Sequence, residues 1–201
     1  MSEGAETDRV ATLLPAVAAG DTGALAELVS VVYGELVQLA RRQRRRWDGD
    51  LTLNTTALVH EAYLKLAGQQ RVPAESRAHF FAVASTTMRH ILCNYARDRR
   101  RKKRGGEVDH VVLGPGTDVV ADLDLPPEQV DRLATLDEAL RRFEQLAPRQ
   151  AQVLQCRFFG GMSVEDTAVA LGLSPRSVKR DWQFARAWLR RGMQAELESA
   201  D

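Results

Sequence analysis

Residues 163–180 read SVEDTAVALGLSPRSVKR and carry the signals of two short helices joined by a sharp turn. Ser163 is followed three residues later by an acid, a spacing close to that of a capping box. Gly172 suits a left-handed turn, and Ser174 is a good cap for a second helix with proline in its first turn. Val178 is the expected apolar anchor of that helix. Short helix, glycine turn and capped basic helix together predict a helix-turn-helix.

The second helix of such a unit enters the major groove of DNA, where its N-terminal side chains meet base edges. Arginine pairs with guanine and glutamine with adenine, while arginines further along suit phosphates. The candidate DNA contacts lie on the side away from Val178: Arg176, Ser177, Lys179, Arg180, Gln183 and Arg186. Asp181 either faces inward to an arginine or accepts from a cytosine amine. The alternative to DNA binding is a helical hairpin with a solvated basic face.

Charge is strongly segregated along the 201 residues, although 28 Lys+Arg nearly balance 27 Asp+Glu. Residues 89–104 hold eight bases and one acid, and residues 174–191 hold six bases and one acid. Between them, residues 107–138 hold nine acids and one base. Because salt screens charges beyond about 8–10 Å, a polyanion meets these local fields rather than the sum. Two basic clusters predict two nucleic-acid contact surfaces, against the alternative of two solvated helix faces.

Helical periodicity dominates the chain, and Val111-Val112 is the one short strand signal. Residues 105–127 combine glycine, proline and acids, which is typical of a linker. We hypothesise that these acids lie against a basic cluster when the protein is free. The expected helices cover about 8–18, 21–46, 54–66, 76–104, 128–146, 148–158, 163–171 and 174–192.

Several classes of protein are disfavoured by composition. No run of 18 apolar residues occurs, which argues against a transmembrane helix, and the acidic N-terminus lacks a signal-peptide pattern. Cys93 and Cys156 are too few for a disulfide framework, so we expect a reducing cytoplasm. His60 and Glu61 begin like a zinc-protease motif, but Leu64 stands where its second histidine belongs. With no glycine-rich phosphate loop, metal cluster or nucleophile with its base, we expect no enzyme, no metal and no cofactor.

Two parts of the chain resemble a known family. Residues 163–191, SVEDTAVALGLSPRSVKRDWQFARAWLRR, resemble region four of bacterial sigma factors. LNTTALVHEAYLKL at 53–66 and SRAHFFAVASTTMRHILCNYARDRRRKKRGG at 76–106 resemble region two of the small extracytoplasmic-function (ECF) class. The resemblance implies an all-α fold of two small helical domains joined by a flexible linker. Their expected bounds are 1–104 for region two, 105–127 for the linker and 128–201 for region four.

The resemblance also implies a function: binding core RNA polymerase and directing it to promoters, without catalysis by the chain itself. Region two is expected to bind the minus-ten element and region four the minus-thirty-five element. Promoter DNA and core RNA polymerase are the expected partners. The family also allows an anti-sigma factor as a partner. We expect no contact with a membrane. The implied polymerase contacts are Leu58, Glu61, Leu64 and Lys65. The implied region-two DNA contacts are His79, Arg89, His90, Asn94, Arg97, Arg100 and Arg101.

Some of these residues have a structural alternative. Leu58 fits a core position as well as an interface, and the spacing of Phe80, Phe81 and Tyr95 favours core. Thr167 and Trp182 stand where region four usually carries aliphatic residues, and Asn54-Thr55-Thr56 replaces an acidic pair common in region two. Two rival functions stay open: a stand-alone helix-turn-helix regulator, and an RNA-binding adaptor that uses the basic run 99–104.

Overall fold

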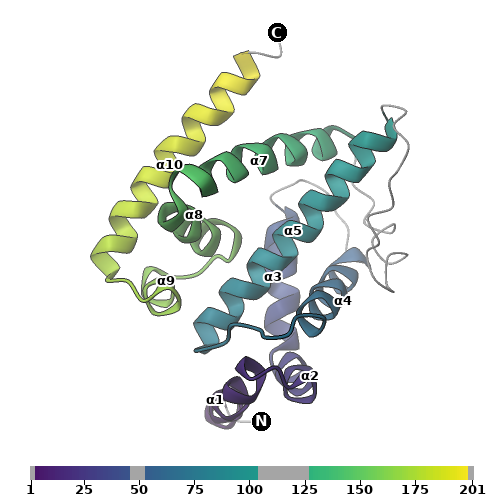
Figure 1. Ribbon diagram of the computed structural model, residues 1–201, viewed down its shortest axis with the longest axis vertical. Coiled ribbons are helices and arrows are strands. Elements are labelled where there is room, and N and C mark those ends of the chain that lie inside the picture. The colour runs from purple at the N-terminus through teal and green to yellow at the C-terminus, as the bar shows by residue number, and fades with distance from the viewer. Residues whose placement is uncertain (1–2, 46–52, 104–126, 199–201) are drawn as a thin grey trace.

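The computed structural model describes the backbone of residues 3–45, 53–103 and 127–198, and the side chains of 5–44, 55–95 and 136–191. Every element in these ranges is helical, which confirms the predicted all-α class (Figure 1). Val111-Val112 and nearly all of the predicted linker lie outside the described residues. The elements are α1 (Glu3–Ala18), α2 (Thr22–Val31), α3 (Tyr33–Arg45), α4 (Leu53–Ala67), α5 (Arg77–Lys103), α7 (Pro127–Leu146), α8 (Pro148–Leu154), the π-helical turn η1 (Gln155–Phe159), α9 (Val164–Leu171) and α10 (Pro175–Glu198).

Helices α1–α5, the first helical group, share one apolar core. Leu28 of α2, Leu58 of α4 and Met88 of α5 are each completely buried in it. Phe80 of α5 is 1% exposed and packs in the same core. Burying a side chain of this size stabilises the fold by about 1.5–3 kcal/mol, so this shared core is what positions α4 and α5.

The predicted single helix over 21–46 is wrong, because the chain bends between α2 and α3. Val32 leaves the helical conformation (φ −97°, ψ 15°), and the two helices are bent by 75°. Leu28 before the bend and Leu36 after it are both buried in the same core, so α2 and α3 both contribute apolar side chains to it. In the described parts of the chain no single helix is long and apolar enough to cross a membrane; only this bent pair, counted together, reaches that length and composition.

Helices α7–α10 form the second helical group, in which α7, α8 and α10 pack around Phe143, which is completely buried. Its ring stacks on Trp188 at 4.4 Å between centroids and on Phe184 at 6.3 Å. The expected helix 148–158 is in fact α8 followed by η1. In this π-helical turn the Gly160 N–H donates to the carbonyl of Gln155 five residues earlier, so the turn holds one residue more than an α-helix.

Helix α5 contacts both helical groups. One of its faces completes the core of the first group, and the opposite face packs against α7, η1 and α9. Figure 1 shows α7 beside the upper half of α5 and α9 near its lower end. A small apolar cluster joins Ala82 of α5 to Cys156, Met162 and Ala170 of the second group. The middle of that face, around Ala82, Ser85 and Arg89, is therefore covered by the second helical group.

Gly20 closes the turn between α1 and α2 in a left-handed conformation (φ +95°). A Cβ atom there would lie 2.5 Å from the carbonyl oxygen of Gln70. We expect Gly20→Ala to lower the free energy of unfolding by at least about 1 kcal/mol, from backbone strain and this contact.

Gly34 provides the matched control, since it lies in helix α3 and its added Cβ meets nothing within 4 Å. Gly34→Ala should stabilise the protein by about 0.5 kcal/mol, because alanine loses less backbone entropy. Unfolding by denaturant, followed by circular dichroism, measures the free energy of unfolding of both variants. A Gly20→Ala protein as stable as the wild type would contradict the structure of this turn.

Candidate nucleic-acid interface

The predicted helix-turn-helix is present in the second helical group. The Ser163 hydroxyl oxygen accepts from the Asp166 N–H at 2.9 Å and begins α9. Gly172 ends α9 with φ +62°, the left-handed value that the turn requires. The Ser174 oxygen then accepts from the Ser177 N–H at 3.1 Å, so α10 begins at Pro175. Both helix starts are fixed by side-chain caps within the motif itself.

The unusual residues of this motif are accommodated in its interior. Val178 is completely buried and packs with Val153 and Ala168. Thr167 is completely buried as well, and its hydroxyl donates to the Ser163 carbonyl at 2.7 Å. Trp182 is partly buried, and the guanidinium groups of Arg157 and Arg186 lie 5.7 and 5.9 Å from the centre of its ring. Neither departure from the aliphatic pattern leaves a buried polar side chain without a partner.

Asp181 faces inward, which decides between its two interpretations. Its side chain is 2% exposed and accepts from Arg149 Nε at 2.8 Å and Arg149 Nη2 at 3.1 Å. Gln150 Nε2 adds a third hydrogen bond at 3.2 Å. Burial raises the pKa of Asp181, but these hydrogen bonds and the Arg149 charge outweigh it, so the pKa lies below the ordinary 3.8. The carboxylate anchors α10 to α8 and is not available to a base.

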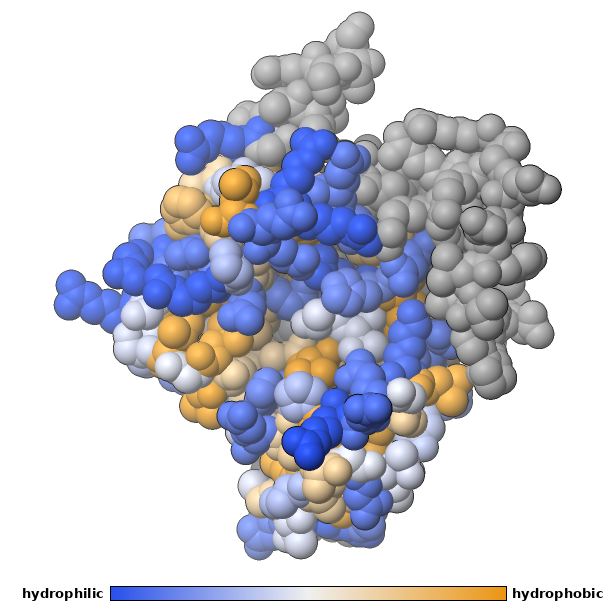
Figure 2. Space-filling view, viewed as in Figure 1, coloured by the Kyte–Doolittle hydropathy of each residue, from blue (hydrophilic) through white to orange (hydrophobic). Residues whose placement is uncertain are grey.

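The outward face of α10 presents the predicted row of polar and cationic side chains. Ser177 is partly buried beside its cap, and the other predicted contacts are exposed: Arg176, Lys179, Arg180, Gln183 and Arg186. Arg180 keeps a 68% exposed side chain although its Nε lies 3.7 Å from Asp181. Figure 2 shows hydrophilic side chains over most of the surface where α7 and α10 lie, with apolar patches between them.

The predicted DNA residues of α5 lie in a different setting. His90 is exposed, His79 and Asn94 are partly buried, and Arg89 is 2% exposed. His79, Arg89 and His90 line a cleft of about 580 Å³ between the two helical groups, whose other wall includes Glu144. The side chains of the remaining three predicted residues lie outside the described part of the chain: Arg97, Arg100 and Arg101.

Arg89 is held by carboxylates of α7. Its Nη2 donates to Glu144 Oε1 at 2.5 Å, and its Nη1 lies 3.9 Å from Asp137 Oδ1. The guanidinium also lies over the Phe159 ring at 5.6 Å, while its Nε and Nη1 have no hydrogen-bond acceptor. Desolvation, and next to it the Arg89 charge, lowers the pKa of His90, so this imidazole is neutral at pH 7.

The residues expected to meet polymerase are distributed between the core and the surface of α4. Leu58 is completely buried and Glu61 is 7% exposed, whereas Leu64 is 44% exposed and Lys65 is partly buried. The core interpretation therefore holds for Leu58. It holds for the aromatic residues of α5 too, since Phe80 lies inside the core and Phe81 and Tyr95 pack against it.

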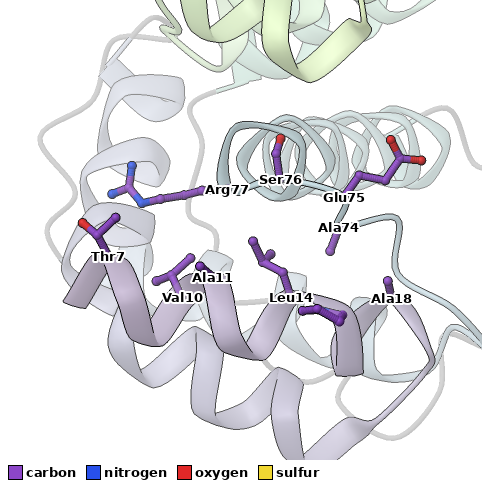
Figure 3. Close-up of a pocket in the computed structure, with 10 residues that line it drawn as sticks. Thr7, Val10, Ala11, Leu14, Ala18, Ala74, Glu75, Ser76 and Arg77 are labelled. Carbon is purple, nitrogen blue, oxygen red and sulfur yellow. The ribbon is translucent and has the colours of Figure 1, made fainter. Parts of the chain in front are cut away.

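A second hollow lies away from all the predicted residues. This groove of about 600 Å³ runs between α1 and the segment that precedes α5. Figure 3 shows Val10 and Leu14 of α1 facing Ala74 across it, with Arg77 at one end. It is lined mainly by apolar side chains and brings together no set of groups suited to catalysis.

Three important residues were not singled out from the sequence: Arg149, Asp137 and Glu144. Arg149 lies 32 positions before its partner Asp181, and Glu144 lies 55 positions after Arg89. The available signal was weak: two acids seven residues apart lie on one face of α7. No group of three or more potential metal ligands occurs among the residues that the structure describes.

An all-α chain with a helix-turn-helix and an exposed basic face on its second helix is typical of nucleic-acid-binding proteins. The sequence model of one family, described as ECF sigma factor, matches residues 7–195. The chain therefore belongs to the ECF sigma factors, a family of regulatory factors of transcription initiation rather than enzymes. No curated protein and no solved structure shows a significant match.

The Arg149–Asp181 contact predicts a pH-dependent stability. Arg149→Ala leaves the buried carboxylate without its main partner and should lower the free energy of unfolding by about 1–3 kcal/mol at pH 7. Because the folded-state pKa of Asp181 is lowered, its contribution is complete above pH about 4 and is lost as the pH falls through that folded value. The difference in the free energy of unfolding between the wild type and Arg149→Ala should therefore become smaller as the pH falls into the acid range.

Arg142→Ala is the matched control, because Arg142 forms an exposed pair with Glu138 one turn away. Its effect should stay below about 0.5 kcal/mol at every pH. Unfolding is measured by the fluorescence of Trp182 and Trp188, two of the three tryptophans. Equal losses in the two variants would argue against the Asp181 anchor.

Proposed function

We propose that this chain binds core RNA polymerase and directs it to specific promoters through two DNA contacts. The second helical group, assigned to a region-four domain over 128–201, reads the minus-thirty-five element with α10. The first group, assigned to a region-two domain over 1–104, docks on polymerase and holds the minus-ten element. The observation that carries the proposal is the exposed α10 row on a helix-turn-helix within a chain of this family.

The α10 row suits base recognition because its backbone is fixed from behind. Val178 and Asp181 anchor α10, so Arg180 and Gln183 project from a rigid support. An arginine and a glutamine on such a helix have the geometry for guanine and adenine edges in the major groove. Arg186, beside Trp182 and further from the helix start, suits a phosphate. These roles support direct sequence readout by α10.

The first helical group supplies a candidate docking surface for polymerase. Leu64 is a large apolar side chain that is 44% exposed on α4, one helical turn from the exposed His60. Lys65 adds a cation on the same part of the helix. An exposed leucine flanked by polar side chains can supply the apolar centre that a protein interface surrounds with a polar rim. Leu58 and Glu61 support this surface from beneath rather than contacting the partner.

Two contacts made by one chain raise the effective concentration of the second contact once the first has formed. Moderate affinities of the two domains are then enough for a specific promoter complex. We place the protein in the cytoplasm with polymerase and DNA, and an anti-sigma factor is a partner that this assignment allows.

The test is run-off transcription with core RNA polymerase over a library of promoter fragments, with and without this protein. We expect new, specific start sites that depend on the chain. Arg180→Ala should cost about 1–3 kcal/mol of binding at one promoter position and relax the base preference there. Arg9→Ala removes another exposed arginine, paired with Glu27 in the first helical group, and should leave the start sites unchanged.

The rival functions give different results in the same assay. A stand-alone regulator binds a two-fold symmetric duplex tightly without polymerase and does not need residues 54–104. An RNA-binding adaptor loses binding when the charges of 99–104 are removed and tolerates Arg180→Ala. The proposal would be overturned if the protein produced no new start sites and also showed either of these binding patterns.

Leu64→Glu tests the polymerase surface separately. A charge in the middle of an apolar contact should weaken binding to core polymerase by about tenfold or more. Since Leu64 is exposed, thermal unfolding of the variant should match the wild type within the small range of surface substitutions. Binding is measured by fluorescence anisotropy of labelled protein with core polymerase. Unchanged affinity would remove α4 from the interface.

A further inference from the structure

The covered face of α5 combines small side chains with one buried cation. Ala78, Ala82, Ser85 and Arg89 follow one another at spacings of four, three and four residues and therefore form one helical stripe. All four contact or lie against the second helical group. The large apolar residues of α5 lie on its opposite side, inside the core of the first group. The two groups therefore meet through small and polar side chains.

The polar links that the described residues form across this contact centre on Ser85 and Arg89, and the second is incomplete. Gln155 Nε2 donates to Ser85 Oγ at 3.2 Å, and Gln43 Nε2 of the first group reaches the same oxygen at 3.0 Å. Arg89 pairs with Glu144 and Asp137, yet its Nε and Nη1 are buried without an acceptor. A buried guanidinium with unsatisfied N–H groups regains hydrogen bonds when water reaches it. The two groups can therefore separate at this contact more easily than at a large apolar one, as at other polar contacts between domains.

The carboxylates of α7 occupy the place that a nucleic acid would need. Arg89 and His90 belong to the surface assigned to the minus-ten element, and they line the cleft whose other wall carries Glu144. A carboxylate and a phosphate are both anions that bind an arginine in the same planar geometry. Glu144 and a phosphate therefore cannot occupy the Arg89 Nη2 position together.

We propose that Asp137 and Glu144 of α7 act as an intramolecular mimic of DNA phosphates, holding the second helical group over the minus-ten surface of α5 until the two groups separate. The partner of this face in the free protein is thus the chain's own second group. The inference rests on the proposed DNA role of α5, and it adds that the role is masked in the closed arrangement.

Two cysteines report the separation without reference to transcription. Cys156 is 2% exposed in the cluster that joins the two groups, and burial raises the pKa of its thiol to about 12. Cys93 is completely buried in the core of the first group. Opening of the contact exposes the first thiol, whereas the second stays protected until its own group unfolds.

The experiment compares alkylation of both thiols by iodoacetamide in the full chain, resolved by mass spectrometry of the peptides. Glu144→Gln should speed alkylation of Cys156 about tenfold, as expected for loss of a charge-assisted hydrogen bond, and leave Cys93 unchanged. Asp137→Asn should act in the same direction. Glu138→Gln removes the same charge from an exposed position of α7 and should change neither thiol. Equal Cys156 rates in wild type and Glu144→Gln would overturn the proposal.

The second measurement is binding of a short fluorescein-labelled single-stranded DNA of mixed sequence. Glu144→Gln should tighten binding several-fold relative to Glu138→Gln, which has the same net charge. Faster Cys156 alkylation without tighter binding would show an opening that does not mask a DNA surface, and would overturn the proposal. Run-off transcription by the wild type decides the proposed function independently, so the two failures are distinguishable.

Discussion

The packing of α5 constrains the rest of the structure, because this one helix has to satisfy two neighbours. Phe80, Met88 and Ile91 form its apolar face and complete the core of the first helical group. The opposite face, with Ser85 and Arg89, is covered by the second group. Since the two faces share one backbone, the core fixes the direction in which Arg89 points. The ion pair with Glu144 follows from that direction and from the register of α7.

The two faces of α5 are very unequal in strength. The apolar face buries large side chains that no solvent can replace, and it keeps α5 within its group. The hydrogen bonds of the polar face can be replaced by hydrogen bonds to water or to another anion. A helix built in this way stays attached to one group and is released by the other. This inequality links the stability of the first helical group to the control proposed for the DNA surface of α5.

The helix-turn-helix could be predicted from the sequence because its determinants are local. The caps Ser163 and Ser174 and the turn at Gly172 all act within a few residues of their own positions. The break at Val32 could not be predicted, because it depends on a core to which both halves of the predicted helix contribute. The direction of Asp181 was left as two alternatives for the same reason: its partner, Arg149, lies on another helix. The burial of Arg89 depends on contacts still more distant along the chain.

The π-helical turn η1 makes the length of one short segment more important than its composition. It places Gln155 against α5, Phe159 beneath Arg89 and Arg157 over Trp182. If one residue were deleted, an α-helical turn would take its place, and the three side chains could not all keep these positions. The helix-turn-helix would still fold, since its caps lie within it, but its attachment to α5 would change. The contact between the two helical groups thus depends on the residue count at a single turn, a quantity that no substitution can alter.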